Sequence, residues 1–309
     1  MSKNAPVFVH HGVDATCCST VCMDNREFLL VGTSKGKCHL CDIFSYQFKE
    51  TVYEDSDKRS IVGAQARLHE NVLEAVVHIR DYAIMVLARK EGKWDECRVI
   101  PVNHYGFCSF ILIPDAIILP DVEKSDNLVR ILWDSGNADI IPLGNKATPF
   151  CLNSFESSVL VGDEAGTLTI SKNGFMRKKS LYSEPIFGLA VSTSGLIAAC
   201  STLPPIKCFR MSDLDDKDII SLDYRPDASG CGSLVFLPSE KTLLAGYWDG
   251  AIRGFSIKKR QVILFLDFHK ETITRLCWFG NMESGETKKD QMVSCSKDGT
   301  ICFWNFPKH

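Results

Sequence analysis

Short apolar runs alternate with small polar turns that contain glycine, and this phrase recurs along the chain. Each copy predicts two β-strands joined by a tight turn, because glycine adopts positive φ without steric cost and aspartate tolerates turn conformations. The flanking residues are β-branched or aromatic and alternate in part, as half-buried strands do. No stretch of a dozen residues has a clear helical period, so the pattern predicts an all-β chain. The four clear copies cover residues 29–40, 159–170, 243–255 and 292–305.

Weaker units of the same kind fill the intervals between the clear copies. Their strand-like segments cover residues 83–87, 129–134, 196–200 and 206–209. Three weak and four clear units give seven, and dividing 309 residues by seven gives about 44 residues each, the spacing expected of WD40 blades. We therefore predict one seven-bladed WD40 β-propeller domain that covers residues 1–309.

The two ends of the chain predict how the propeller closes. Only residues 305–309 follow the strand that ends at Trp304, so the last blade lacks its outer strand. The apolar run at residues 6–10 has no blade of its own. We expect this N-terminal strand to complete the last blade and close the ring, which leaves no long sheet edge open.

Residues 294–304 resemble the WD40 consensus. His269, Ser294, Asp298 and Trp304 stand where that family places a structural hydrogen-bond tetrad. The resemblance implies that they tie the loop entering the last blade to its inner turn. We expect this role to be architectural and not catalytic, because buried polar groups need partners.

A narrower resemblance covers the last two blades, at residues 244–255, 262–269 and 294–299. These segments resemble the family of guanine nucleotide-binding protein subunit beta-like protein 1 and the fungal ASTRA-associated protein 1. Residues 106–108 and 184–189 also resemble short landmarks of that family. The first hundred residues resemble it only as a generic propeller.

This resemblance implies a non-enzymatic adaptor that needs no cofactor or metal. It would act with the Tel2–Tti1–Tti2 co-chaperone in the maturation and stability of phosphatidylinositol-3-kinase-related kinases, with RuvB-like AAA+ ATPases as further partners. A true G-protein β subunit is not expected, because it would need an N-terminal coiled-coil helix, and strand-like sequence begins here at Pro6.

The sequence leaves three alternatives to this adaptor. The first is a substrate receptor of a cullin–DDB1 ubiquitin ligase, but its W-D-x-R signature is missing: Ser135-Gly136 follow Trp133-Asp134, and Asn305 follows Trp304. The second is another WD40 interaction hub, such as a subunit of a chromatin-regulating complex. The third is a propeller hydrolase, for which the sequence offers no convergent acid, base and nucleophile.

Composition and charge limit the classes of partner and the cellular compartment that we expect for this protein. The net charge of −3 favours neither a nucleic acid nor a membrane as the main partner. No signal peptide is visible, and the most apolar stretch, residues 107–119, is broken by Pro114 and Asp115. Without an export signal, the 14 cysteines are interpreted as reduced, buried, small hydrophobic residues. The prediction is a protein of the cytoplasm and nucleus.

Several short motifs have a simpler structural interpretation. Residues 32–36 fit G-x-S-x-G, but a strand and not a helix is expected next, which favours a hairpin turn over a nucleophile elbow. Cys38 and Cys41 have C-x-x-C spacing without a second pair, and residues three apart on a strand point to opposite faces, so a zinc site is not expected. Solvated turns or loops are predicted for the charged segments at residues 177–179, 258–260 and 213–218, and a mobile insertion for residues 280–290.

Trp248 occupies the tight turn before Asp249, where other copies carry a charged residue. Two interpretations stay open: the ring anchors a protein partner, or it packs on the neighbouring blade. The candidate partner-binding residues are Tyr247, Trp248, Asp249 and Arg253.

Overall fold

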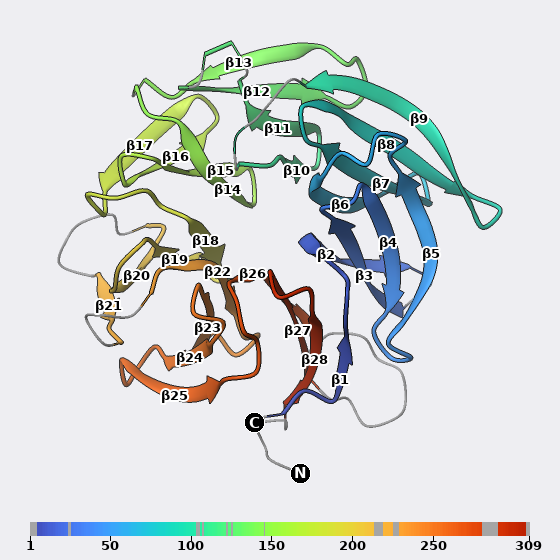
Figure 1. The fold of residues 1–309 in the computed structure, drawn as a ribbon. Coiled ribbons are helices and arrows are strands. Elements are labelled where there is room, and N and C mark those ends of the chain that lie inside the picture. Colours follow the sequence, from blue (N-terminus) through green and yellow to red (C-terminus); the bar gives the residue numbers. More distant parts are fainter. Residues whose placement is uncertain are drawn as a thin grey trace. The chain divides into compact units, whose positions relative to one another are not determined.

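The structure is a computed structural model, and it describes residues 5–23, 26–102, 106, 108–121, 123–124, 126–144, 146–212, 219–224, 229–279 and 290–306. Within these residues the regular elements are all strands, and they form seven antiparallel sheets of four strands each (Figure 1). Six sheets take their four strands in chain order, which is how propeller blades are built. The predicted all-β, seven-bladed β-propeller fold is confirmed.

One compact unit comprises Met1–Tyr105 and Asp267–His309 and holds three blades. The first blade consists of β2 (Ala15–Met23), β3 (Arg26–Thr33), β4 (Lys37–Asp42) and β5 (Gln47–Glu54). The second consists of β6 (Ile61–His69), β7 (Val72–Ile79), β8 (Tyr82–Lys90) and β9 (Lys93–Val102). The last blade consists of β26 (Ile273–Phe279), β27 (Asp290–Ser296), β28 (Ile301–Phe306) and β1 (Phe8–His10).

The other compact unit comprises Gly106–Leu266 and holds four blades. The third blade consists of β10 (Ile111–Ile113), β11 (Ala116–Pro120), β12 (Asn127–Leu132) and β13 (Ala138–Pro142). The fourth consists of β14 (Pro149–Phe155), β15 (Ser158–Asp163), β16 (Thr167–Lys172) and β17 (Phe175–Ser180). The fifth consists of β18 (Gly188–Val191), β19 (Leu196–Cys200), β20 (Ile206–Arg210) and β21 (Ile220–Leu222). The sixth consists of β22 (Cys231–Phe236), β23 (Thr242–Tyr247), β24 (Ile252–Ser256) and β25 (Gln261–Leu266). One domain over residues 1–309 stays a prediction.

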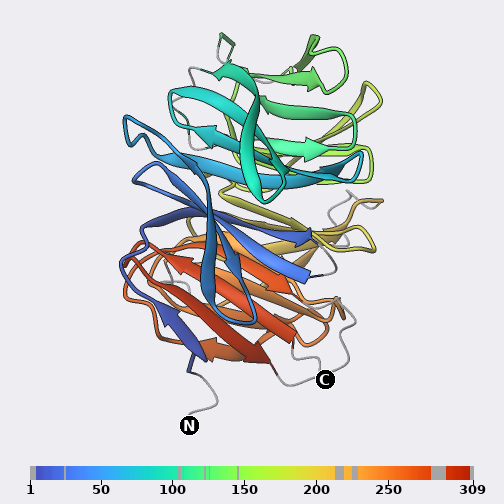
Figure 2. The same ribbon diagram turned by 90° about the vertical axis from the view of Figure 1, so that its right-hand side faces the viewer.

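The N-terminal strand completes the last blade, as predicted. β1 pairs antiparallel with β28, with Phe8 opposite Phe303 and His10 opposite Ile301. The two strands lie side by side in both views, as the blue and red ends of the chain (Figure 1 and Figure 2). The Phe8 ring stacks on Tyr46 of the first blade at a centroid distance of 5.0 Å. The first and last segments of the chain are therefore joined by a strand ladder and by ring contacts, although Phe8 itself is 37% exposed.

Glycine in the β3–β4 turn allows a close backbone approach. Gly36 has a φ of +77°, and a Cβ there would lie 2.9 Å from the backbone of Lys58. Any larger residue would be strained by its backbone conformation and would also collide with that segment. The strand β4 follows directly, so the G-x-S-x-G motif of residues 32–36 is a hairpin turn, as predicted.

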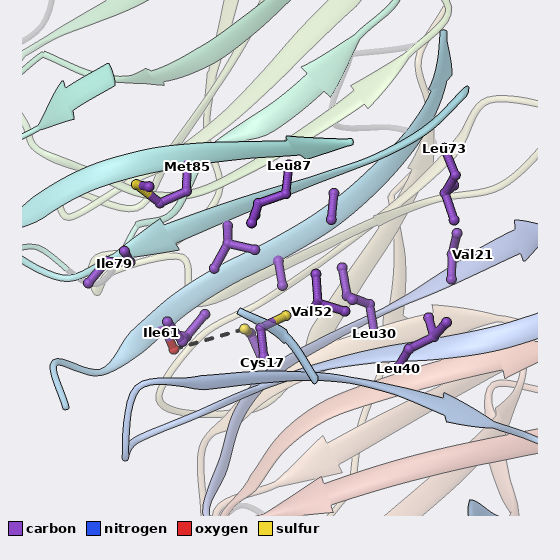
Figure 3. Packing of buried hydrophobic residues seen from close by; sticks show 14 of the residues in the cluster. Cys17, Val21, Leu30, Leu40, Val52, Ile61, Leu73, Ile79, Met85 and Leu87 are labelled. Carbon is purple, nitrogen blue, oxygen red and sulfur yellow. Dashed lines mark hydrogen bonds between the residues drawn. The ribbon is translucent and has the colours of Figure 1, made fainter. Parts of the chain in front are cut away.

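Buried side chains fill the space between the first and second blades (Figure 3). Leu30 and Leu40 of the first blade meet Val77 and Met85 of the second, and each is at most 3% exposed. Cys38 belongs to this cluster, whereas Cys41, three residues on, packs in the cluster shared with the last blade. The two thiols of the C-x-x-C motif thus face opposite sides of their sheet, as the sequence predicted.

The solvated turn predicted for the basic residues 177–179 is wrong. Residues 177–179 lie inside the outer strand β17, and the hairpin tip is formed by Asn173 and Gly174, whose φ angles are 50° and 81°. Asn-Gly accepts positive φ at both positions and therefore sets the turn just before the basic run. The other triplet, residues 258–260, does form the turn between β24 and β25. Three segments named from the sequence lie wholly or partly outside the described residues: the acidic segment 213–218, residues 280–289 of the insertion 280–290, and Phe107 of the landmark 106–108.

Candidate functional site

A buried hydrogen-bond network joins the loop before β26 to the turn between β27 and β28. The Trp304 indole Nε1–H donates to Ser294 Oγ at 2.8 Å, and Ser294 Oγ lies 2.7 Å from His269 Nε2. On the other side of the ring, His269 Nδ1 lies 2.8 Å from Thr300 Oγ1 and 3.4 Å from Asp298 Oδ2. The His269, Ser294 and Trp304 residues are each at most 3% exposed. We call these five residues the His269 network.

Protonation in the His269 network follows from burial and from its hydrogen bonds. Burial lowers the pKa of His269, and the nearby Asp298 carboxylate only partly offsets this. Burial opposes the charge of Asp298, but hydrogen bonds from Thr300 and from the Lys270 backbone hold its pKa below the usual range. A neutral imidazole that accepts at Nε2 from Ser294 and donates at Nδ1 satisfies both neighbours. This arrangement fits an architectural tie, and that role stays a prediction.

A different aspartate contact forms in the turn between β23 and β24. Arg253 Nη1 and Nη2 donate to the two carboxylate oxygens of Asp249 at 3.1 and 2.6 Å. The Arg253 guanidinium also lies 4.2 Å from the ring centroids of both Tyr224 and Tyr247, and 5.4 Å from that of Phe265. A guanidinium held between aromatic faces gains cation–π attraction in addition to its ion pair. Arg253 is only 5% exposed, so this charge is fixed within the blade.

Trp248 belongs to a row of three half-buried aromatic rings from three successive blades. Phe187 lies edge-to-face between Phe150, at a centroid distance of 5.4 Å, and Trp248, at 5.2 Å. The Trp248 ring also covers the backbone of Gly230, where a Cβ would lie 2.6 Å from it. We call Phe150, Phe187 and Trp248 the aromatic row.

The members of the aromatic row lie at corresponding ends of their blades. Phe150 and Phe187 stand at the start of the first strand, and Trp248 stands in the turn between the second and third strands. In a four-stranded antiparallel sheet these two positions are at the same end. The row therefore links the fourth, fifth and sixth blades along one edge, where half-buried aromatic rings can serve as anchors for a partner.

Solved structures confirm the fold but do not identify a family. The computationally designed protein Ika8 matches with a TM-score of 0.65 at 14% identity, over 98% of this chain and 99% of that one. Sqt1 of Saccharomyces cerevisiae matches with a TM-score of 0.72 at 12% identity, over 99% and 100%. Likeness at such low identity shows the fold alone. The chain is a seven-bladed β-propeller, consistent with a WD40-type protein.

The sequence comparisons found no relative. No family model matches the chain, and no curated protein matches it. The resemblance of the last two blades to guanine nucleotide-binding protein subunit beta-like protein 1 therefore stays a prediction.

Burial divides the candidate partner-binding residues into two pairs. Tyr247 and Arg253 are 3% and 5% exposed and belong to the interior of the sixth blade. Trp248 is half-buried and Asp249 is exposed, so these two supply the surface of the turn. Trp248 does pack on the neighbouring blade, through Phe187, and its remaining exposed area keeps the partner-anchor interpretation open.

Sequence reasoning missed the two phenylalanines of the aromatic row. Phe150 precedes Cys151, which pairs with Gly162 near the end of β15, and Phe187 precedes Gly188, which pairs with Cys200 at the end of β19. The two phenylalanines hold similar places in successive blades, and an alignment of the repeats is the signal that could have found them. Tyr224 was missed as well, because it lies in a segment that carries no repeat signal.

Two further findings concern ligands and membranes. In the part of the chain that the structure describes, no three His, Cys, Asp or Glu side chains are grouped as ligands for a metal ion. The described residues also contain no helix long and apolar enough to cross a bilayer.

Proposed function

We propose that this protein is a non-enzymatic scaffold that acts with the Tel2–Tti1–Tti2 co-chaperone in the maturation and stability of phosphatidylinositol-3-kinase-related kinases. RuvB-like AAA+ ATPases are further partners in this proposal, and its compartments are the cytoplasm and the nucleus. The resemblance of residues 244–255, 262–269 and 294–299 to the ASTRA-associated family supports the assembly. The propeller fold supports a role in protein–protein contacts.

The aromatic row is the observation that carries the scaffold role. Its three half-buried rings connect three blades, and Asp249 adds an exposed carboxylate beside them. Aromatic side chains supply large, rigid contact areas and are enriched among the residues that dominate binding energy. The row is therefore our candidate for the surface that holds a partner.

Affinity purification with quantitative mass spectrometry tests this proposal. We expect the wild-type protein to recover Tel2-type co-chaperone subunits under gentle conditions, and the Trp248→Ala variant to recover much less of them. Trp94→Ala is the matched control, because Trp94 is also half-buried but lies on β9 and donates to Glu50 at 2.8 Å.

The outcomes separate the alternatives. Loss of the co-chaperone from Trp248→Ala but not from Trp94→Ala, with both variants folded by circular dichroism, supports the proposal. Absence of Tel2-type subunits from the wild-type purification overturns it. Recovery of DDB1 in their place would favour the ubiquitin-ligase receptor.

A further inference from the structure

The outer strands of the blades differ in how they are protected against pairing with another chain. Natural sheet edges are blunted by charged residues, by proline or by short length. Among the described residues, β5, β9 and β17 carry charged side chains, and β13 carries Asp139 and Pro142. The outer strands β1 and β21 have only three residues each.

β25 lacks all three of these protections. It has six residues, Gln-Val-Ile-Leu-Phe-Leu, with no charge and no proline, and it is the last strand of its sheet (Figure 1). Ile263 is 55% and Phe265 is 40% exposed. A β-bulge interrupts its pairing with β24 at Ile263, whereas β5 and β9 combine bulges with charges. A bulge is itself a protection of a sheet edge, but it can also re-aim a side chain, and this one leaves Ile263 facing solvent.

A compact basic group stands at the beginning of this apolar edge. Lys258, Lys259 and Arg260 form the turn that leads into β25, and all three are exposed. No ion pair among the described residues involves any of them, so their charge is directed to solvent. The apolar edge of β25 and the basic turn of residues 258–260 together form one surface. An extended peptide with apolar residues and an acidic end would match this surface in both hydrophobicity and charge.

We propose that β25 is a docking edge to which an extended peptide adds as a fifth, antiparallel strand of the sixth blade. The peptide carries alternating apolar residues followed at its C-terminal end by acidic residues. In this mode, backbone hydrogen bonds supply affinity and the side chains supply specificity. The inference concerns a surface apart from the aromatic row and does not depend on which assembly the protein joins.

The polarity of the peptide follows from the antiparallel pairing that the proposal specifies. In an antiparallel pair, the C-terminal end of the added strand lies beside the N-terminal end of β25. That end is continuous with the turn of residues 258–260, so acidic residues there meet the three basic side chains. The alternate apolar residues of the peptide lie against Ile263 and Phe265, which removes their exposed area from water.

Fluorescence anisotropy with a labelled synthetic peptide tests this surface on the full-length protein. The probe has three Thr-Val repeats followed by three glutamates, and a second probe carries the glutamates at its N-terminal end. We expect saturable binding of the first probe and binding weaker by at least about tenfold for the second, because reversed polarity separates the charges. A third probe with two central residues replaced by proline cannot complete the ladder and should not bind.

Two variants of the protein and one matched control locate the site. Ile263→Lys places on β25 the charge that other outer strands carry, and should weaken binding of the first probe by at least about tenfold. Lys258→Glu combined with Lys259→Glu should have a similar effect. Ile140→Lys is the control, because Ile140 lies on the outer strand β13 and is 54% exposed, against 55% for Ile263.

Each result of these experiments supports or overturns the proposal that β25 is a docking edge. Loss of binding in Ile263→Lys but not in Ile140→Lys, with protection of the β25 amides from hydrogen exchange by the peptide, supports it. Equal binding of the forward and reversed probes overturns it, as does the absence of binding by any probe. If the wild-type protein self-associates and Ile263→Lys abolishes this association, the strand that pairs with β25 comes from a second copy of the chain. That result would also overturn the proposed peptide ligand. None of these results bears on recovery of the Tel2-type co-chaperone.

Discussion

Two turns with the same Asp-Gly dipeptide hold their aspartates in different ways. The Asp298 carboxylate in the last blade accepts a hydrogen bond at 2.8 Å from the backbone N–H of Lys270, which lies in the loop before β26. Asp249 of the sixth blade is held by Arg253, four residues further along the same hairpin. The first carboxylate therefore ties two distant segments of a blade together, whereas the second binds within its own hairpin, and Asp249 reaches the distant Ser229 hydroxyl only through its backbone N–H, at 3.0 Å.

The difference also concerns charge and burial. The His269 network is closed, because its imidazole, hydroxyl and indole groups are buried and satisfy one another. In the Asp249–Arg253 pair the arginine is buried, but 37% of the aspartate side chain is exposed. One turn thus contributes to the interior of the protein, and the other presents a carboxylate at its surface beside Trp248.

The largest effect is expected when the His269 network loses its central hydroxyl. Ser294→Ala leaves the Trp304 indole N–H and His269 Nε2 buried without their partner, and should lower the free energy of unfolding by about 2–4 kcal/mol. Urea denaturation measures the loss. Ser158→Ala is the control, because Ser158 is also buried but its hydroxyl has no hydrogen-bond partner among the residues that the structure describes. Equal losses in the two variants would contradict the network's role.

A smaller and asymmetric effect is expected in the sixth blade. Asp249→Ala leaves the buried Arg253 charge without its counter-ion and should cost about 2 kcal/mol, less than a fully buried pair because Asp249 is partly exposed. Arg253→Met fills the space between the aromatic rings and leaves a carboxylate that water can reach, so it should cost only about 1 kcal/mol. Thermal unfolding of the two variants gives the comparison. A larger loss in Arg253→Met would show that the ion pair matters less than the aromatic contacts.

The pH dependence of the unfolding free energy should reveal the buried His269 of the last blade. Because burial lowers the folded-state pKa of His269, the unfolded chain binds the proton more readily, and stability is lost as the pH falls below about 6.5. His269→Gln removes this titration, so its unfolding free energy should fall less than that of the wild type between pH 7.5 and 5.5. Burial also lowers the pKa of His10 and His39, and the difference between the two proteins cancels their shared contribution. Parallel pH profiles would contradict the assignment.

The smallest effect is expected for an exposed tie between the fifth and sixth blades. Glu240 accepts hydrogen bonds from Thr193 Oγ1 at 2.5 Å and from the Ser194 backbone N–H at 2.8 Å. These bonds and that of the Ser194 hydroxyl lower the pKa of Glu240 to about 2. Solvent screens an exposed group, so Glu240→Gln should cost no more than about 0.5 kcal/mol in a urea titration. A loss comparable to that of Ser294→Ala would mean that the exposed tie is as important as the buried one.

The fold could be predicted from the sequence because its signals are local. Glycine, in some copies together with aspartate, marks the turns of the clear copies, and the apolar run at residues 6–10 together with the expected lack of an outer strand in the last blade predicted β1. The same locality explains the error at residues 177–179. Those residues were assigned to a tip from their charge, although Asn173-Gly174 just before them is the stronger turn signal.

The candidate site was less predictable because its contacts join residues far apart in sequence. Trp248 was singled out from its turn, but Phe150 and Phe187 come from two other blades and meet only after the blades are packed. The burial of Arg253 was equally hidden, because its aromatic neighbours Tyr224 and Phe265 lie on either side of it in the chain. A sequence pattern can name such residues one by one but cannot show that they touch.

Pairing of β1 with β28 has a consequence for synthesis on the ribosome. Phe8 is translated long before its partner Phe303, and at about 5–20 residues per second the delay is roughly 15–60 s. During that time β1 has no ladder to join, and its apolar residues stay open to unwanted contacts. The final blade is therefore the last to be completed, because its outer strand waits for the end of synthesis.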